Sequence, residues 1–219
     1  MAKRNKTILA WLFTLAFVLF CCGLVLFRGY WWHGLTQGSA GEASGPEAVI
    51  YNYGRDFVKY GKEFNVPPEY LAALCMLECS GRKPAGVRYE KVVYSRLKMV
   101  KLRLRKNYEH VKPADLNDAE DEALQNLASS WGPFQLMGYK CLLYNIKVSD
   151  IRGKDATYWG VKWISEAYGK YLLKKDFKSA FHIHNAGMPY PASGKPKTYD
   201  PDYVNEGLRW MKYFKPKFQ

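Results

Sequence analysis

Apolar residues recur every three or four positions along most of the chain, which is the spacing of an amphipathic helix. The first such run consists of Ile50, Tyr53, Phe57, Tyr60 and Phe64. No alternation of apolar and polar residues, as a half-buried strand requires, extends over a useful length. The pattern therefore predicts an all-α domain over residues 47–219.

A second helix is predicted to begin at the Pro67-Pro68 pair. Proline suits the first helical turn at Pro68, and Glu69 favours the positive end of the helix dipole. The segment EYLAALCMLECS follows, and Gly81 is a natural terminator. Further helices are predicted over residues 91–106, from Asp118 to the Gly132-Pro133 break, and over 156–173, 176–184 and 201–214.

The N-terminus has a different pattern, because residues 7–27 carry no charge at all. At a rise of about 1.5 Å per residue, a helix of this length crosses the hydrocarbon layer of about 30 Å. Lys3, Arg4 and Lys6 precede the run and predict that the N-terminus stays in the cytoplasm while the rest is exported. A cleaved signal peptide fits less well, since its apolar region usually spans only about 7–15 residues.

These features divide the chain into three parts. Residues 1–33 are predicted to form a basic N-terminus and a single transmembrane anchor. Residues 34–46 are rich in Gly, Ser and Ala and predict a flexible linker. Residues 47–219 form the helical domain.

Composition and charge narrow the class of protein. The chain of 219 residues is 48% hydrophobic and 16% aromatic, which indicates a packed core rather than disorder. Its formal net charge of +13 favours partners with fixed negative charge. The basic segment 98–106 lacks a recognisable DNA-binding motif, and export removes nucleic acid as a partner. We expect it to meet anionic wall polymer or lipid headgroups, or to form a solvated helix face.

The cysteines and histidines do not predict a disulfide framework or a metal site. Three of the five cysteines, Cys75, Cys79 and Cys141, lie outside the predicted anchor, and we expect them to be small buried residues. His182 and His184 are two positions apart, so on a helix they point to different faces. We therefore expect no metal and no cofactor.

One carboxylate occupies an unusual position. Spacing from Leu71, Leu74 and Cys75 places Glu78 on the apolar face of the second helix, in its last turn. Withdrawal from water and the unpaired carbonyls of the helix end both disfavour a negative charge there. Those are the conditions for a carboxylic acid that donates a proton near neutral pH. The alternative is a simple ion pair with Arg82.

Four short motifs follow one another in a recognisable order. They are Glu78-Cys79-Ser80-Gly81, Ser130-Trp131-Gly132-Pro133-Phe134-Gln135-Leu136-Met137-Gly138, His184-Asn185-Ala186-Gly187 and Asp202-Tyr203-Val204. Together they resemble the lysozyme-like superfamily, in particular its soluble-lytic-transglycosylase-type and N-acetylmuramidase-type domains. The resemblance covers roughly residues 52–214.

The chain departs from the transglycosylase pattern at three points. Cys79 stands where those domains usually have Ser, His184 replaces Tyr, and Pro133-Phe134 replaces Leu-Met. The phrase around Trp131 is closer to the muramidase branch, as is the segment from Gly86 to Glu90.

The resemblance implies cleavage of peptidoglycan glycan strands between N-acetylmuramic acid and N-acetylglucosamine. Glu78 would be the proton donor, and in a lytic transglycosylase it would then act as the base. A hydrolytic muramidase needs a second carboxylate. Glu90 is the candidate, with pairing to Arg88 or Lys91 as its alternative role.

The resemblance further implies that four residues line the substrate groove, namely Gln135, Met137, Asn185 and Tyr203. For Gln135 and Met137 the alternative is ordinary packing. For Asn185 the alternative is termination of a helix.

The compartment implied is the bacterial inner membrane, with the domain on its periplasmic side. The partners would be peptidoglycan, the membrane through residues 7–27, and an envelope or secretion complex. Two non-enzymatic alternatives stay open. One is a catalytically dead wall-binding scaffold, and the other is a membrane-tethered basic adaptor.

Overall fold

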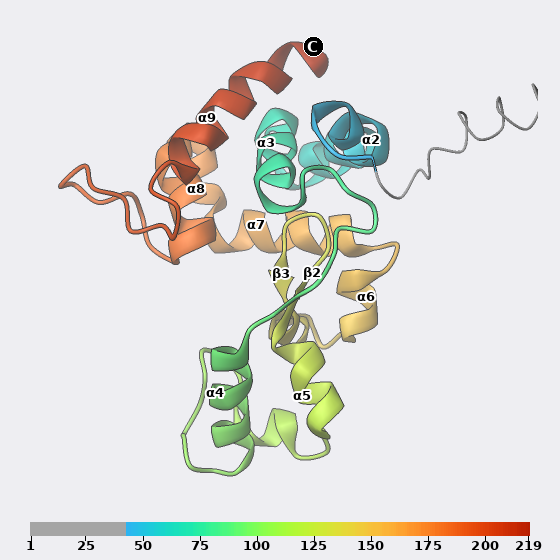
Figure 1. Ribbon diagram of the computed structural model, residues 1–219, viewed down its shortest axis with the longest axis vertical. Coiled ribbons are helices and arrows are strands. Elements are labelled where there is room, and N and C mark those ends of the chain that lie inside the picture. The colour runs from blue at the N-terminus through green and yellow to red at the C-terminus, as the bar shows by residue number, and fades with distance from the viewer. Residues whose placement is uncertain (1–42) are drawn as a thin grey trace, which may run out of the picture. The chain divides into compact units, whose positions relative to one another are not determined.

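A computed structural model describes residues 43–219, which are mostly helical, as predicted (Figure 1). The helices are α2 (Pro46–Phe64), α3 (Pro68–Cys79), α4 (Lys91–Lys101), α5 (Asp121–Leu127), α6 (Val148–Arg152), α7 (Ala156–Leu173), α8 (Phe177–Ala186) and α9 (Tyr203–Phe214), with 3₁₀ helices η1 (Pro113–Leu116), η2 (Gly138–Tyr144) and η3 (Lys215–Lys217). No helix within this part of the chain is both long and apolar enough to cross a membrane. The anchor predicted at residues 7–27 lies outside the described residues.

Two predicted helices have the wrong bounds. The helix expected over 91–106 ends at Lys101, because Arg103 adopts a left-handed backbone with φ 59°. The helix expected from Asp118 begins only at Asp121 and ends at Leu127. The residues that follow it pair with other strands instead of continuing the helix.

The structure contains a small antiparallel sheet that the sequence pattern did not predict. Its strands are β1 (Arg88–Tyr89), β2 (Ser129–Trp131) and β3 (Leu136–Met137), in the order β1-β2-β3. Arg88 lies opposite Ser130, which in turn lies opposite Met137. Strands of two or three residues are too short to show an alternating pattern, so only the tertiary structure reveals them.

The core consists of two hydrophobic clusters. The first gathers around α3, whose residues from Tyr70 to Cys75 are all fully buried between α2, α7, α8 and α9. The second lies beneath α4, α5, η2 and α6. Trp163 of α7 packs against both clusters. The middle of helix α3 is apolar on every side, so the helix is buried all round and not only along the one apolar face that the sequence pattern marked.

The C-terminal end of α3 is tied to α2, and this fixes the position of Glu78. Ser80 and Gly81 both adopt left-handed backbone conformations, with φ 53° and 73°. A Cβ atom at Gly81 would lie 2.4 Å from the backbone nitrogen of Val49, so only glycine fits. Asn52 donates to the Gly81 carbonyl at 2.8 Å, and Tyr53 donates to the Arg82 carbonyl at 2.7 Å.

Candidate active site

Glu78 is a mostly buried carboxylate without a cationic partner in the described part of the chain. Its side chain is 17% exposed, and its Oε1 accepts a hydrogen bond from the hydroxyl of Tyr203. His184 Nε2 lies 3.7 Å from the same oxygen. Within residues 43–219 no lysine or arginine comes within ion-pair distance of Glu78, so the alternative pairing with Arg82 is wrong. The carboxylate is held by neutral or polar neighbours only.

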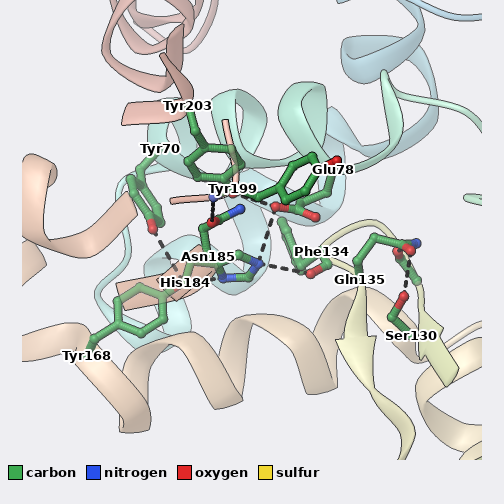
Figure 2. A network of polar contacts seen from close by, with 11 residues as sticks. Tyr70, Glu78, Ser130, Phe134, Gln135, Tyr168, His184, Asn185, Tyr199 and Tyr203 are labelled. Carbon is green, nitrogen blue, oxygen red and sulfur yellow. Dashed lines mark hydrogen bonds and ion pairs between the residues drawn. The ribbon is translucent and has the colours of Figure 1, made fainter. Parts of the chain in front are cut away.

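Tyr203 begins helix α9, which packs along α3 and so brings the phenol to the end of that helix. The ring is buried, and the hydroxyl points to Glu78 (Figure 2). Burial and the negative charge of Glu78 hold the pKa of Tyr203 well above its usual range. The hydroxyl therefore stays protonated and acts as a hydrogen-bond donor at any physiological pH.

His184 of α8 is held between two fixed groups. Its Nε2 lies 3.1 Å from the backbone carbonyl of Phe134, and its Nδ1 lies 2.8 Å from the hydroxyl of Tyr168. A carbonyl only accepts, so Nε2 carries the hydrogen and Nδ1 accepts from Tyr168. Burial lowers the pKa of His184 and outweighs the opposing effects of Glu78 and of the Phe134 carbonyl. The imidazole is thus neutral, in the Nε2–H tautomer.

A second tyrosine extends this network into the core. The Tyr70 hydroxyl of α3 donates to the Tyr168 hydroxyl at 3.3 Å, and both rings are fully buried (Figure 2). Helix α7 is kinked at Tyr168, where φ is −148° and ψ is 17°. The donors therefore follow one direction, from Tyr70 to Tyr168 to His184. The Nε2–H of His184 donates to the Phe134 carbonyl, and Nε2 lies 3.7 Å from the Glu78 carboxylate.

Gln135 is the last residue of the turn between β2 and β3 and has a left-handed conformation, with φ 48°. Its Oε1 accepts from the Ser130 hydroxyl at 2.7 Å, and its Nε2 donates to the Gly132 carbonyl at 3.2 Å. Figure 2 shows this pair on the sheet side of Glu78. The amide is therefore fixed in orientation before any ligand is present.

Asn185 does not terminate its helix. Gly187, with φ 73°, ends α8 by donating its N–H to the Ile183 carbonyl at 2.8 Å. The Asn185 Oδ1 instead accepts from the backbone N–H of Tyr199 at 3.3 Å, which ties down the loop between α8 and α9 (Figure 2). The segment Asn185-Ala186-Gly187 therefore does end the helix, through Gly187, and the Asn185 side chain has a separate contact.

Three of the four predicted groove residues share one cavity. A cavity of about 500 Å³ is lined by Gln135, Met137 and Asn185, together with His184. Tyr203 does not line it but contacts Glu78 directly. Glu78 does not line the cavity either, but His184 lines it and lies 3.7 Å from the Glu78 carboxylate, so His184 connects the cavity to Glu78.

Glu90 adopts its alternative role. It precedes α4, and its Oε1 lies 2.8 Å from Nε of Arg88. It is not among the residues that line the cavity beside His184. The carboxylate that does line this cavity is Glu109, which lies in a loop without a motif, so nothing in the sequence pointed to it.

Helical spacing in the sequence already indicates that His184 is buried. His184 lies four and three positions after Ala180 and Phe181, on the buried face of α8. That spacing places the imidazole toward the core. No comparable sign marks Tyr168 or Tyr70, whose hydroxyls meet only in the folded chain.

The cysteines in the described part are free and buried, as predicted. The sulfurs of Cys75 and Cys79 lie 3.6 Å apart, directly beside the end of α3. Within residues 43–219 no group of three His, Cys, Asp or Glu side chains is arranged to hold a metal ion.

Comparisons with protein-family models, with curated proteins and with solved structures find no match to this chain.

Proposed function

We propose that this protein cleaves the glycan strands of peptidoglycan between N-acetylmuramic acid and N-acetylglucosamine, with Glu78 as the proton donor. The observation that carries the proposal is the environment of Glu78. It is a mostly buried carboxyl that pairs with no lysine or arginine of residues 43–219, and Tyr203 and a neutral His184 lie against it. The convergence of the separate motifs on this carboxyl supports a lysozyme-like fold for the domain.

The proposed first step is general acid catalysis. Glycosidic cleavage needs a proton on the leaving oxygen and stabilisation of an oxocarbenium-like transition state. Because Oε1 takes the contacts of both Tyr203 and His184, Oε2 is the oxygen left to protonate the leaving O4 as the bond from C1 to O4 breaks.

The second step uses the same carboxyl as a base. The acetamido oxygen of the substrate bonds to C1 as the leaving sugar departs. The Glu78 carboxylate, stabilised by the Tyr203 hydroxyl, then removes the proton of the C6 hydroxyl. O6 bonds to C1 and displaces the acetamido oxygen, which gives a 1,6-anhydromuramic end. This lytic transglycosylase route needs one protein carboxylate, which agrees with the pairing of Glu90 to Arg88.

Hydrolysis by a muramidase is the second candidate function. The observation that favours it is Glu109, a carboxylate that lines the cavity next to His184. It would position water for attack at C1, giving a reducing end instead of an anhydro end.

The test is digestion of purified sacculi by the full-length protein in nonionic detergent, followed by mass spectrometry of the released fragments. Glu78→Gln should lower the rate by about 10²–10⁴-fold, because a positioned proton donor contributes that much. Its thermal unfolding should stay close to that of the wild type. Glu166→Gln is the control, since Glu166 pairs with Lys162 and Tyr144 on the surface.

Unchanged activity of a folded Glu78→Gln protein would refute the role of Glu78. An anhydro end lacks one water relative to a reducing end, so mass separates the two routes. Reducing ends only, with loss of activity in Glu90→Gln or Glu109→Gln, would replace the transglycosylase by the muramidase.

We also propose that the domain works on the periplasmic side of the inner membrane, anchored through residues 7–27. The basis is the basic cluster before an apolar run long enough to span the bilayer. A reporter fused after Gln219 should be active only outside the cytoplasm. Cytoplasmic activity of that fusion would contradict the topology.

A further inference from the structure

Lys140 is the one cation among the described residues that line the cavity beside His184. It belongs to η2, and its side chain is only 15% exposed. Its ammonium lies 5.0 Å from the ring centroid of Tyr139 and 5.6 Å from that of Trp163. Two aromatic faces therefore hold the charge at a fixed place in the cavity wall.

Glu109 fixes this ammonium without using up its donors. Glu109 Oε2 accepts from Lys140 at 2.5 Å, and its Oε1 accepts from the Tyr139 hydroxyl at 2.6 Å. Burial alone would raise the pKa of Glu109, but the hydrogen bonds from Lys140 and Tyr139 outweigh it, so the pKa lies below its usual range. Glu109 is thus ionised. An ammonium has three N–H donors, and within the described residues Lys140 uses one of them.

The site is close to the catalytic network. Trp163 lies edge-on to His184, with the ring centroids 5.8 Å apart, while the same indole carries the ammonium of Lys140. One aromatic ring therefore separates Lys140 from the imidazole that faces Glu78. Asn185 and Gln135 add amide groups to the cavity, and Met137 adds apolar surface.

We propose that Lys140 is a specificity-determining residue that binds a carboxylate of the substrate in this cavity. The inference rests on the proposed function, because it places part of the same glycan beside Glu78. A plain N-acetylglucosamine polymer has amides and hydroxyls but no carboxylate. A muramyl residue supplies one either from its lactyl group, when that group is free, or from the peptide that is attached to it. Lys140 therefore selects muramyl strands over uncharged strands.

The experiment measures binding separately from cleavage. Full-length protein in nonionic detergent, carrying Glu78→Gln so that ligands persist, is titrated by calorimetry with three ligands of matched length. These are muramyl fragments with their peptides, muramyl fragments freed of peptide, and an uncharged β-1,4-linked N-acetylglucosamine oligosaccharide. The same titrations are repeated with Lys140→Met, which keeps the apolar stem and removes the charge.

Lys162→Met is the matched control. Lys162 likewise pairs with a glutamate, Glu166 at 2.6 Å, and lies 5.4 Å from the ring centroid of Tyr144, but it does not line this cavity. We expect at least one carboxylate-bearing ligand to bind about tenfold more tightly than the uncharged one, because a hydrogen bond to a charged group contributes a difference of about that size. Lys140→Met should abolish this preference, and Lys162→Met should keep it.

The carboxylate-bearing fragment that shows the preference identifies the source, the lactyl group or the peptide. Equal binding of all three ligands by the parent, or a preference that survives Lys140→Met, would overturn the inference. If Lys140→Met does not fold, Glu109→Gln is the deciding variant. It keeps the Lys140 ammonium and removes the competing carboxylate, so the preference for carboxylate-bearing ligands should persist or grow. Loss of that preference in Glu109→Gln would overturn the inference. A carboxylate preference in a protein whose wild type releases nothing from sacculi would refute the proposed function and leave this site standing.

Discussion

Replacement of Tyr168 by phenylalanine tests the hydrogen-bond network beneath Glu78. The change keeps the buried ring and removes only the hydroxyl between Tyr70 and His184. His184 Nδ1 then has no donor. The imidazole cannot escape by shifting its proton to Nδ1, because the Phe134 carbonyl on its other side requires the Nε2–H. A buried acceptor is therefore left unpaired.

The cost follows from those contacts. An unsatisfied buried polar group destabilises by about 1–3 kcal/mol, and the hydrogen bond from Tyr70 is lost as well, by about 0.5–1.5 kcal/mol. We expect Tyr168→Phe to lower the free energy of unfolding by about 1.5–4.5 kcal/mol in total. For a domain of this size each kcal/mol lowers the thermal unfolding midpoint by about 2–4 °C, so that midpoint should fall by roughly 3–18 °C.

Tyr70→Phe is the matched control. It also removes one hydroxyl from a fully buried tyrosine, but that hydroxyl is the first donor of the chain. Tyr168 still donates to His184 at 2.8 Å, so no acceptor on the imidazole is orphaned. The expected loss is only about 0.5–1.5 kcal/mol, the contribution of one ordinary hydrogen bond.

Urea unfolding of both full-length variants in detergent, followed by tryptophan fluorescence, measures the difference. Sacculus digestion by the same samples shows whether the imidazole must be held for activity, and Tyr168→Phe should lose more of it than Tyr70→Phe. Equal stability of the two variants would refute the direction assigned to the chain, and with it the neutral Nε2–H form of His184.

Two further predictions concern stability. Burial lowers the pKa of His184, so below about pH 6.5 the unfolded chain binds a proton that the folded chain does not, and the free energy of unfolding should fall by up to about 1.4 kcal/mol per pH unit. Denaturant unfolding between pH 7 and pH 5 should show a weaker dependence of this free energy on pH in His184→Asn than in the wild type. An equal dependence would contradict the assigned pKa shift. Gly207→Ala should destabilise by about 1–3 kcal/mol, since its Cβ would lie 2.8 Å from the Phe181 ring, whereas Gly54→Ala, whose Cβ would meet only Ile50 at 3.6 Å, should be neutral or stabilising in thermal unfolding.

Much of the helical framework was predictable because it depends on local spacing. Five helices, α2, α3, α7, α8 and α9, lie where periodicity and helix-terminating residues placed them. The free and buried state of the three cysteines outside residues 1–42 was also predicted correctly. These properties follow from side-chain type and from neighbours within one or two helical turns.

Other parts of the fold depended on partners far along the chain. The local pattern predicted helix through Ser129–Trp131, but these residues form a strand because they pair with Arg88–Tyr89 on one side and Leu136–Met137 on the other. The kink at Tyr168 stands directly before Gly169, but the apolar spacing of residues 156–173 did not predict it. Competition between a short local preference and a distant pairing cannot be weighed from the sequence alone.

The candidate site shows the same division. The sequence by itself placed Glu78 at the end of an apolar helix and marked Gln135, Asn185 and Tyr203 as candidate site residues. Only the tertiary structure decided which groups touch that carboxyl, because Tyr203 reaches it across 125 positions of the chain. The tertiary structure also showed that Glu109, and not Glu90, lines the cavity. Glu90 pairs with Arg88, and Glu109 reaches the cavity from a loop that carries no motif. Electrostatic environment is a property of distances in space, and those distances are fixed only when the helices pack.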